Sequence, residues 1–158
     1  MTEPSLIEIL KGFEKHHFRY LLIGGHAVNQ YGSVTITRDF DFWIAPEEKE
    51  KVVQYLTEKF PFDVPSEDAL KRPILTLYGD WQKIDLFLAR RFSNTEGKIL
   101  DFDQCFERSI KIEDSEEKLS IILPAIDDLI ALKKMRQTPR SKDLEDIAFL
   151  ESLKNEEE

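Results

Sequence analysis

Two short apolar segments constrain the fold most. One runs into a pair of glycines, and the other follows a pair of aspartates. Leu21-Leu22-Ile23 runs into Gly24-Gly25, and Asp39-Phe40-Asp41 runs into Phe42-Trp43-Ile44. Both apolar segments have the length of short buried strands. Because residues i and i+2 of a strand point to the same face, we expect the two aspartates to project side by side.

This aspartate pair predicts a metal site. Two carboxylates on one face of a half-buried strand repel each other, and burial costs each of them its hydration. A divalent cation offsets both costs, so Asp39 and Asp41 favour Mg²⁺.

A third carboxylate comes from Asp85, which interrupts the apolar run Ile84–Leu88. An acid inside such a strand is usually paired, capped or functional. If the two strands are neighbours, Asp85 joins Asp39 and Asp41 in a cluster able to hold two Mg²⁺ ions for in-line displacement at phosphorus. A solvent-facing acid on an edge strand, or one in a salt bridge, is the alternative.

The glycines indicate a phosphate site. A strand-to-helix turn at Gly24-Gly25 exposes backbone N–H groups toward an anion. Many tight turns contain such a pair without binding anything, but the helix and the aspartate strand that follow favour the functional interpretation. The repeat Asp101-Phe102-Asp103 precedes a helical segment instead, so Asp103 is expected as a helix N-cap and not as a metal ligand.

The rest of the chain predicts an α+β fold (mixed α/β) with a single domain over residues 1–154 and a disordered tail over 155–158. A hairpin with a Gly79-Asp80 turn is too short for a crossover helix, so the sheet should be antiparallel or mixed. Ser5 and Glu8 predict a capping box, Ser141 a helix N-cap, and residues 91–98 a polar loop. Strands are expected over 18–23, 39–44, 74–78, 84–88, near 110 and over 119–123, and helices over 6–16, 25–31, 46–60, 103–108, 124–136 and from 141.

Composition limits the partners and the compartment. The formal net charge is −9, which excludes nucleic-acid affinity driven by bulk electrostatics, so any polyanion needs a local basic patch. The one cysteine, Cys105, cannot form an internal disulfide, which fits a reducing cytosol. The chain shows no signal peptide and no apolar run of membrane-spanning length, so we expect a cytoplasmic protein without membrane contact.

Several basic residues are candidates for phosphate contact. Lys133 lies on the inward stripe of its predicted helix and needs a counter-charge, which is either a triphosphate or Asp143 or Asp146 of the next helix. Arg38, beside the aspartates, either pairs with phosphate or balances the acidic cluster. His26 is expected as a helix residue first and a substrate contact second. Four further basic residues are expected on the solvated surface: Lys134, Arg136, Arg140 and Lys142. Together with Lys133 they form the one candidate basic patch for an RNA acceptor.

The motifs resemble a known superfamily. Leu22-Ile23-Gly24-Gly25-His26-Ala27, followed by Thr37-Arg38-Asp39-Phe40-Asp41-Phe42-Trp43, is similar to the signature of the polymerase-beta-like nucleotidyltransferases. Asp128–Lys133 and Arg140–Asp146 resemble the closing "D-L-I-x-x-K … R-x-K-D-x-x-D" segment of small prokaryotic members related to the toxin half of type IV abortive-infection systems. Many members carry a serine whose hydroxyl contacts phosphate where this chain has Gly25.

The resemblance implies a nucleotidyltransferase fold, with helices packed on a small mixed sheet and helices at the C-terminus. It implies transfer of a nucleoside monophosphate from an NTP to an acceptor hydroxyl, with release of pyrophosphate. Gly24 and Gly25 would approach the triphosphate, Asp39 and Asp41 would hold Mg²⁺, and Asp85 would bind the metal beside the acceptor and help to deprotonate it.

The acceptor stays open between RNA such as tRNA, a protein, and a small hydroxylated molecule such as an antibiotic. The acidic net charge favours the small molecule over RNA. The alternative function is a catalytically weak nucleotide-binding or partner-binding module, for example in a toxin–antitoxin pair with a cognate partner protein.

Overall fold

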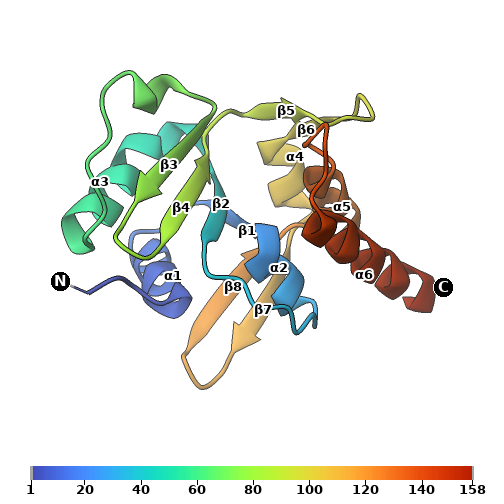
Figure 1. Ribbon diagram of the computed structural model, residues 1–158. Helices are drawn as coiled ribbons and strands as arrows, with labels where there is room; N and C mark the ends of the chain where they lie inside the picture. The colour runs from blue at the N-terminus through green and yellow to red at the C-terminus, as the bar shows by residue number, and fades with distance from the viewer. Residues whose placement is uncertain (1, 158) are drawn as a thin grey trace.

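The main sheet of this protein has the strand order β1-β2-β4-β3, and Figure 1 shows it in a computed structural model that describes residues 2–157. Two further hairpins, β5–β6 and β7–β8, complete the strands. The elements are α1 (Leu6–Lys15), β1 (Tyr20–Ile23), α2 (Gly24–Gln30), β2 (Phe40–Ile44), the 3₁₀ turn η1 (Pro46–Glu48), α3 (Lys49–Lys59), the 3₁₀ turn η2 (Ala69–Lys71), β3 (Ile74–Tyr78), β4 (Lys83–Phe87), β5 (Arg91–Ser93), β6 (Ile99–Asp101), α4 (Phe102–Glu107), β7 (Ile110–Asp114), β8 (Leu119–Leu123), α5 (Ile126–Lys133) and α6 (Ser141–Glu157).

The sheet is mixed because its two central strands are parallel. β2 pairs with β4 in parallel, with Asp41 opposite Asp85. β1 pairs with β2 and β3 pairs with β4, both antiparallel. The chain between the parallel strands crosses over through α3 and then returns along β3 as the edge strand of a hairpin. The predicted α+β class, with helices packed on a small mixed sheet, is confirmed.

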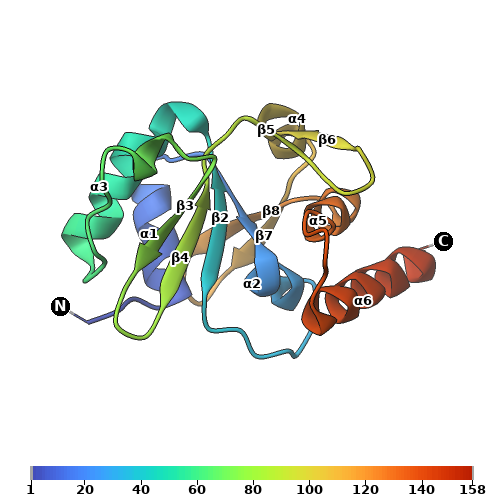
Figure 2. The same ribbon diagram turned by 45° about the horizontal axis from the view of Figure 1, so that its top comes forward.

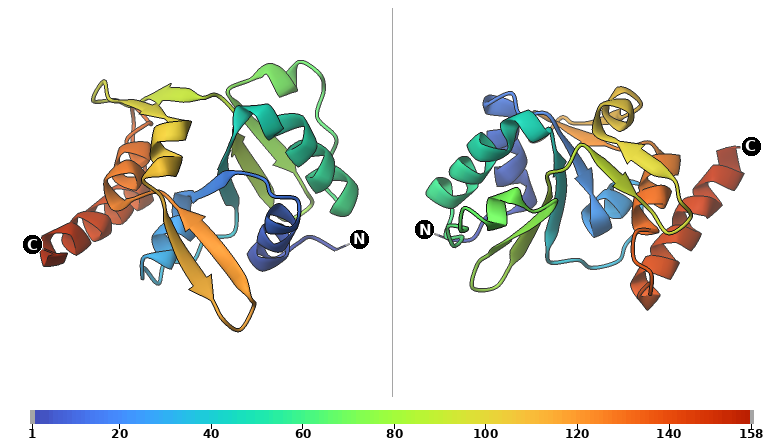
Figure 3. Two further views of the ribbon diagram at one scale, coloured as in Figure 1. Left: turned by 180° about the vertical axis from the view of Figure 1, so that it is seen from behind. Right: turned by 90° about the horizontal axis from the view of Figure 1, so that it is seen from above.

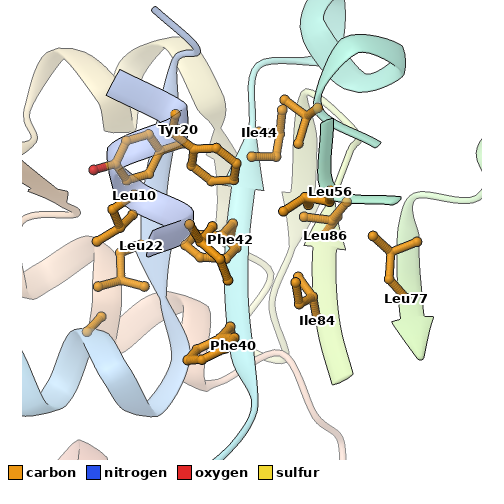
Figure 4. Packing of buried hydrophobic residues seen from close by; sticks show 14 of the residues in the cluster. Leu10, Tyr20, Leu22, Phe40, Phe42, Ile44, Leu56, Leu77, Ile84 and Leu86 are labelled. Atoms are coloured by element: carbon orange, nitrogen blue, oxygen red, sulfur yellow. The ribbon is translucent and has the colours of Figure 1, made fainter. Parts of the chain in front are cut away.

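Alternation along β2 and β4 divides their residues between two packed layers. Phe40, Phe42, Ile84 and Leu86 join one hydrophobic cluster, which also includes residues of α1 and α3 (Figure 4). Trp43, on the opposite face, joins a second cluster with residues of α4, α5 and the β5–β6 hairpin. Figure 2 shows α1 and α3 on one side of the sheet and α5 and α6 on the other. The aspartates of β2 and β4 therefore face the α5 side and not the larger core.

The C-terminal helices and the β7–β8 hairpin extend outward from the main sheet (Figure 3). Among residues 2–157, no helix combines the length and the apolar character that crossing a membrane requires.

The predicted capping box is present, since Ser5 and Glu8 each accept the other's backbone N–H.

The expected polar loop over 91–98 is wrong in part. Arg91–Ser93 and Ile99–Asp101 form a hairpin, in which Phe92 pairs with Leu100 and both side chains are buried. The turn is held by Asn94, whose Oδ1 accepts the N–H groups of Glu96 and Lys98 at 3.0 Å. Strands this short carry too little alternation to be recognised among polar neighbours.

Three predicted helix ends also differ. Asp101 and not Asp103 caps α4, because the Asp101 side chain accepts the Gln104 N–H. Ser141 is the first residue of α6 and not its cap, and Asp143 instead accepts the Arg140 N–H at 3.0 Å. Residues 155–157 continue α6 where a disordered tail was expected, because no Gly or Pro stops the helix there; residue 158 lies outside the described part.

An ion pair between a buried aspartate and a half-exposed arginine holds α4 against α5. Asp128 in the first turn of α5 is buried, and Arg108 at the end of α4 binds it through two nitrogens at 2.9 and 3.0 Å. A buried carboxylate without its partner is strongly destabilising. The pair therefore fixes α5, the helix that carries Lys133, in its place beside the sheet.

We predict that Arg108→Met lowers the free energy of unfolding by about 2 kcal/mol, because it leaves Asp128 buried without a counter-charge. Urea denaturation measures this loss, and Lys111→Met, an exposed lysine on β7, is the control that should change little. The double variant Arg108→Met/Asp128→Leu should regain most of the stability. A double variant as unstable as the single one would show that packing of Arg108, and not its charge, matters here.

Candidate active site

Two carboxylates meet at the centre of the proposed site. Asp41 of β2 and Asp85 of β4 are direct cross-strand neighbours in the parallel pair, so both project from the same face of the sheet. Thr76 of β3, opposite Asp85, donates its hydroxyl to Asp85 Oδ1 at 2.6 Å. All three line a cavity of about 390 Å³ that α5 and the start of α6 close from the other side.

This carboxylate pair is electrostatically strained. Burial, then the negative charge of Asp85 and a hydrogen bond with it, raise the pKa of Asp41 to about 7, against the weaker opposing effects of Lys133 and Lys83. Two adjacent carboxyls in a poorly solvated place cannot both ionise without cost. A cation beside Asp41 would relieve this repulsion and favour the ionised form of the Asp41 carboxyl.

Asp39 does not join this pair. It precedes β2, which begins at Phe40, and its Oδ1 accepts the Lys83 N–H at 3.2 Å. It does not line the cavity, and within residues 2–157 no three His, Cys, Asp or Glu side chains are arranged to hold a metal ion. The i, i+2 alternation that predicted the three-carboxylate cluster applies only inside the paired strand, which is why it fails at Asp39. As a metal ligand, Asp39 stays a prediction.

The glycine bend lies directly against the carboxylates. Gly24 has φ +72, and a Cβ at this residue would lie 2.1 Å from Asp41 Oδ2. Only glycine permits both this backbone conformation and this approach. A Cβ on Gly25 would lie 2.9 Å from Thr37 Oγ1 and 3.1 Å from Lys142 Nζ. A serine at this position would therefore require Thr37 or Lys142 to move.

Lys133 lines the cavity and is also paired on α6. Its side chain is only 10% exposed, and its Nζ lies 2.9 Å from Asp146 Oδ2 and 3.5 Å from Asp143 Oδ1. The sequence left two alternatives for Lys133, an ion pair with α6 or contact with a triphosphate, and the structure shows the ion pair. Because Lys133 also lies on the cavity wall, contact with a triphosphate stays a prediction.

Asp143 gathers further cations at the cavity. Arg136 and Arg140 each place Nε 3.5 Å from its Oδ2 and also line the cavity. Burial opposes ionisation of this carboxyl, but the backbone and side chain of Arg140, together with Lys133, outweigh it and lower the pKa of Asp143. A charged Asp143 thus holds three cationic side chains at one wall.

The remaining predicted residues lie outside the cavity. Arg38 is exposed and has no ion-pair partner among the described residues, so the structure does not bring it to the carboxylates. Lys134 pairs with Glu96 at 3.2 Å. The His26 ring packs on Phe40 at 4.9 Å, and burial together with the charge of Lys142 lowers the pKa of His26.

Sequence reasoning missed Thr76, Thr37 and the position of Lys142. Thr76 could have been found, because the hairpin register that sets Tyr78 opposite Lys83 also sets Thr76 opposite Asp85. Thr37 and Lys142 reach Gly25 from a loop and from α6, and no local pattern signals such contacts. A wider hollow of about 850 Å³ between α1 and α3 contains His16 but none of the predicted site residues.

The raised pKa of Asp41 has a consequence for stability. In the unfolded chain this carboxyl has its ordinary pKa of 3.8, whereas in the fold it is about 7. The folded state then binds more protons between these values, so stability is lost as the pH rises from about 4 to about 7. We predict that Asp41→Asn is more stable than the parent protein at pH 8, by about 4 kcal/mol, and nearly equal to it at pH 4.

Chemical denaturation at the two pH values checks this. Asp80→Asn, at an exposed turn residue of the same hairpin, should show no such pH dependence. An Asp41→Asn effect of equal size at both pH values contradicts the strained pair.

Comparison with solved structures identifies the fold. LnuA, a lincosamide antibiotic adenylyltransferase solved with lincomycin bound, is 19% identical over 97% of this chain and 99% of its own, with a TM-score of 0.68. The antibiotic-resistance factor ANT(2'')-Ia is 17% identical over 94% of this chain and 82% of its own, with a TM-score of 0.59. A candidate nucleotidyltransferase from Thermotoga maritima is 15% identical over 96% of this chain and 91% of its own, with a TM-score of 0.57.

No protein-family model and no curated protein sequence matches the chain. The likeness to these solved structures, at less than 20% identity, is therefore one of fold. It shows that the chain has the nucleotidyltransferase fold, as the sequence motifs led us to expect.

Proposed function

We propose that this protein is a Mg²⁺-dependent nucleotidyltransferase that transfers a nucleoside monophosphate from an NTP to the hydroxyl of a small acceptor and releases pyrophosphate. The observation that carries the proposal is the pair Asp41 and Asp85, which face one cavity beside a glycine bend in a nucleotidyltransferase fold. A pair of adjacent, half-buried acids destabilises a fold, and such pairs are typical of binding and catalytic sites.

The donor set at this pair suits Mg²⁺. Carboxylate oxygens are the ligands that this cation prefers, and the raised pKa of Asp41 beside Asp85 marks a place where positive charge is favourable. Asp41 and Asp85 would hold the ion, with Asp39 as a candidate further ligand and a second ion as in other phosphoryl-transfer sites. When bound, the ion would neutralise charge that develops on the phosphoryl oxygens.

The chain's own groups would position the reactants. Thr76 fixes the orientation of the Asp85 carboxylate through its hydrogen bond. Asp85 would accept the proton of the acceptor hydroxyl, as the resemblance implies. Lys133, Arg136 and Arg140 offer positive charge at the opposite wall for the phosphates, and Gly24 keeps the backbone close to Asp41. Positioning and electrostatics account for most of the rate in such reactions.

The cavity favours a small acceptor over RNA. Its volume of about 390 Å³ is in the range of small-molecule sites. Apolar side chains line part of it, namely Ile74, Phe87, Leu132 and Met135. Two proteins of similar fold are an antibiotic adenylyltransferase and an antibiotic-resistance factor, which supports a hydroxylated compound of that kind. A cytoplasmic location and a cognate partner protein stay predictions.

Asp41→Asn and Asp85→Asn should each lower NTP-dependent pyrophosphate release by about 100-fold or more. Each substitution removes a carboxylate that would hold the Mg²⁺ ion, which stabilises negative charge in the transition state. The assay incubates the protein with each labelled NTP, Mg²⁺ and pools of hydroxylated metabolites, antibiotics, tRNA and protein. Asp80→Asn, an exposed acid on the same hairpin, is the matched control and should keep full activity.

Full turnover by Asp41→Asn would count against the proposal. Calorimetric binding of Mg-NTP by the parent protein without pyrophosphate release from any pool would favour the alternative, a nucleotide-binding module with little turnover.

A further inference from the structure

One lysine next to the glycine bend has no acidic partner. Lys142, in the first turn of α6, is half-buried, and its Nζ lies 3.1 Å from the point that a Cβ on Gly25 would occupy. No carboxylate lies within ion-pair distance of it in the described part of the chain. A half-buried ammonium usually has a counter-charge.

The contrast with its neighbours is sharp. Lys133, Arg136 and Arg140, which lie on the cavity wall, all pair with carboxylates of α6. Lys134 pairs with Glu96. In a chain with a net charge of −9, acidic partners are abundant. A lysine that remains unpaired beside the candidate site is therefore available to an anionic ligand.

A hydroxyl lies at the same place. Thr37 Oγ1 is 2.9 Å from the same Cβ point on Gly25, so an ammonium and a hydroxyl both border this residue. His26, on α2, lies near them, and burial followed by the charge of Lys142 lowers its pKa against the opposing charge of Asp39. Lys142 thus supplies the positive charge at this end of the bend.

The two glycines separate groups of opposite character. On the Gly24 side lies the carboxylate of Asp41, which favours a cation, and on the Gly25 side lie Lys142 and Thr37, which favour an anion. A ligand that crosses the bend needs bound metal at one end and negative oxygens at the other. A magnesium-bound polyphosphate chain has this distribution of charge.

We propose that Lys142 Nζ and Thr37 Oγ1 bind the terminal phosphates of the nucleotide, the part that leaves as pyrophosphate. This assignment rests on the proposed function and deepens it. It predicts tighter binding of triphosphates than of monophosphates, because a monophosphate lacks the terminal phosphates that would contact Lys142 and Thr37. It also gives this role to Lys142 in place of Arg38, because Lys142 is half-buried against Gly25 whereas Arg38 is exposed.

Binding of inorganic tripolyphosphate with Mg²⁺, measured by calorimetry, tests the proposal without knowledge of the acceptor. Lys142→Met should weaken this binding about tenfold or more and Thr37→Val a few-fold, since hydrogen bonds to charged groups contribute more than neutral ones. Lys142→Arg should retain most of the affinity. Lys134→Met, which removes the same charge outside the cavity, should bind like the parent protein.

AMP separates a phosphate contact from a general structural effect. It lacks the terminal phosphates, so its affinity should be equal in Lys142→Met and the parent protein, and melting temperatures should also agree because no ion pair is lost. Unchanged tripolyphosphate affinity in Lys142→Met, or no tripolyphosphate binding by the parent protein, overturns the proposal. So does a loss confined to a single-stranded RNA oligonucleotide, which would assign Lys142 to nucleic-acid binding.

The two proposals can fail separately. If Lys142 governs tripolyphosphate binding but no NTP is turned over, the enzymatic function fails and the phosphate site stands. If NTPs are turned over and Lys142→Met has the KM of the parent protein, only the phosphate assignment fails.

Discussion

The parallel pairing of β2 with β4 is the constraint on which the site depends. Its register sets Asp41 opposite Asp85 on the face that meets α5, while Phe42 and Leu86 face α1 and α3. A slip of one residue in either strand would place an acid in the larger hydrophobic core. Burial of the apolar face therefore fixes the position of the carboxylates as firmly as it fixes the fold itself.

The helices that follow the sheet carry positive side chains that face the negative charge of Asp41 and Asp85. α5 and α6 bring Lys133, Arg136 and Arg140 to the far wall of the cavity, and Asp143 holds them together. The ion pair of Arg108 with Asp128 keeps α5 in position. An acidic chain thus concentrates cations where a polyphosphate would need them. Lys142, beside the glycine bend, has no acidic partner among residues 2–157.

The parts of this site that follow from local patterns could be predicted from the sequence. Period-two alternation predicted which face of its strand each aspartate occupies, and helical spacing predicted that Lys133 points inward. That Asp41 and Asp85 lie opposite each other depends on the parallel pairing of β2 with β4, which could be stated from the sequence only as a condition. Asp39 does not lie beside Asp41 as predicted, because β2 begins one residue later, at Phe40. Alternation of side chains between the two faces does not extend to a residue outside the strand. Lys142 and Thr37 meet Gly25 only through tertiary packing between segments far apart in the chain, which no periodicity reports. The β5–β6 hairpin was missed because its strands are three residues each.

The central claim is that Asp41 and Asp85 together form a divalent-cation site. Anomalous diffraction from crystals soaked in Mn²⁺, which takes the same oxygen ligands as Mg²⁺, tests it most directly. We expect an anomalous peak within about 2.3 Å of one carboxylate oxygen from each aspartate. A fully soaked crystal without a peak between them, or with Mn²⁺ bound only elsewhere, would contradict it.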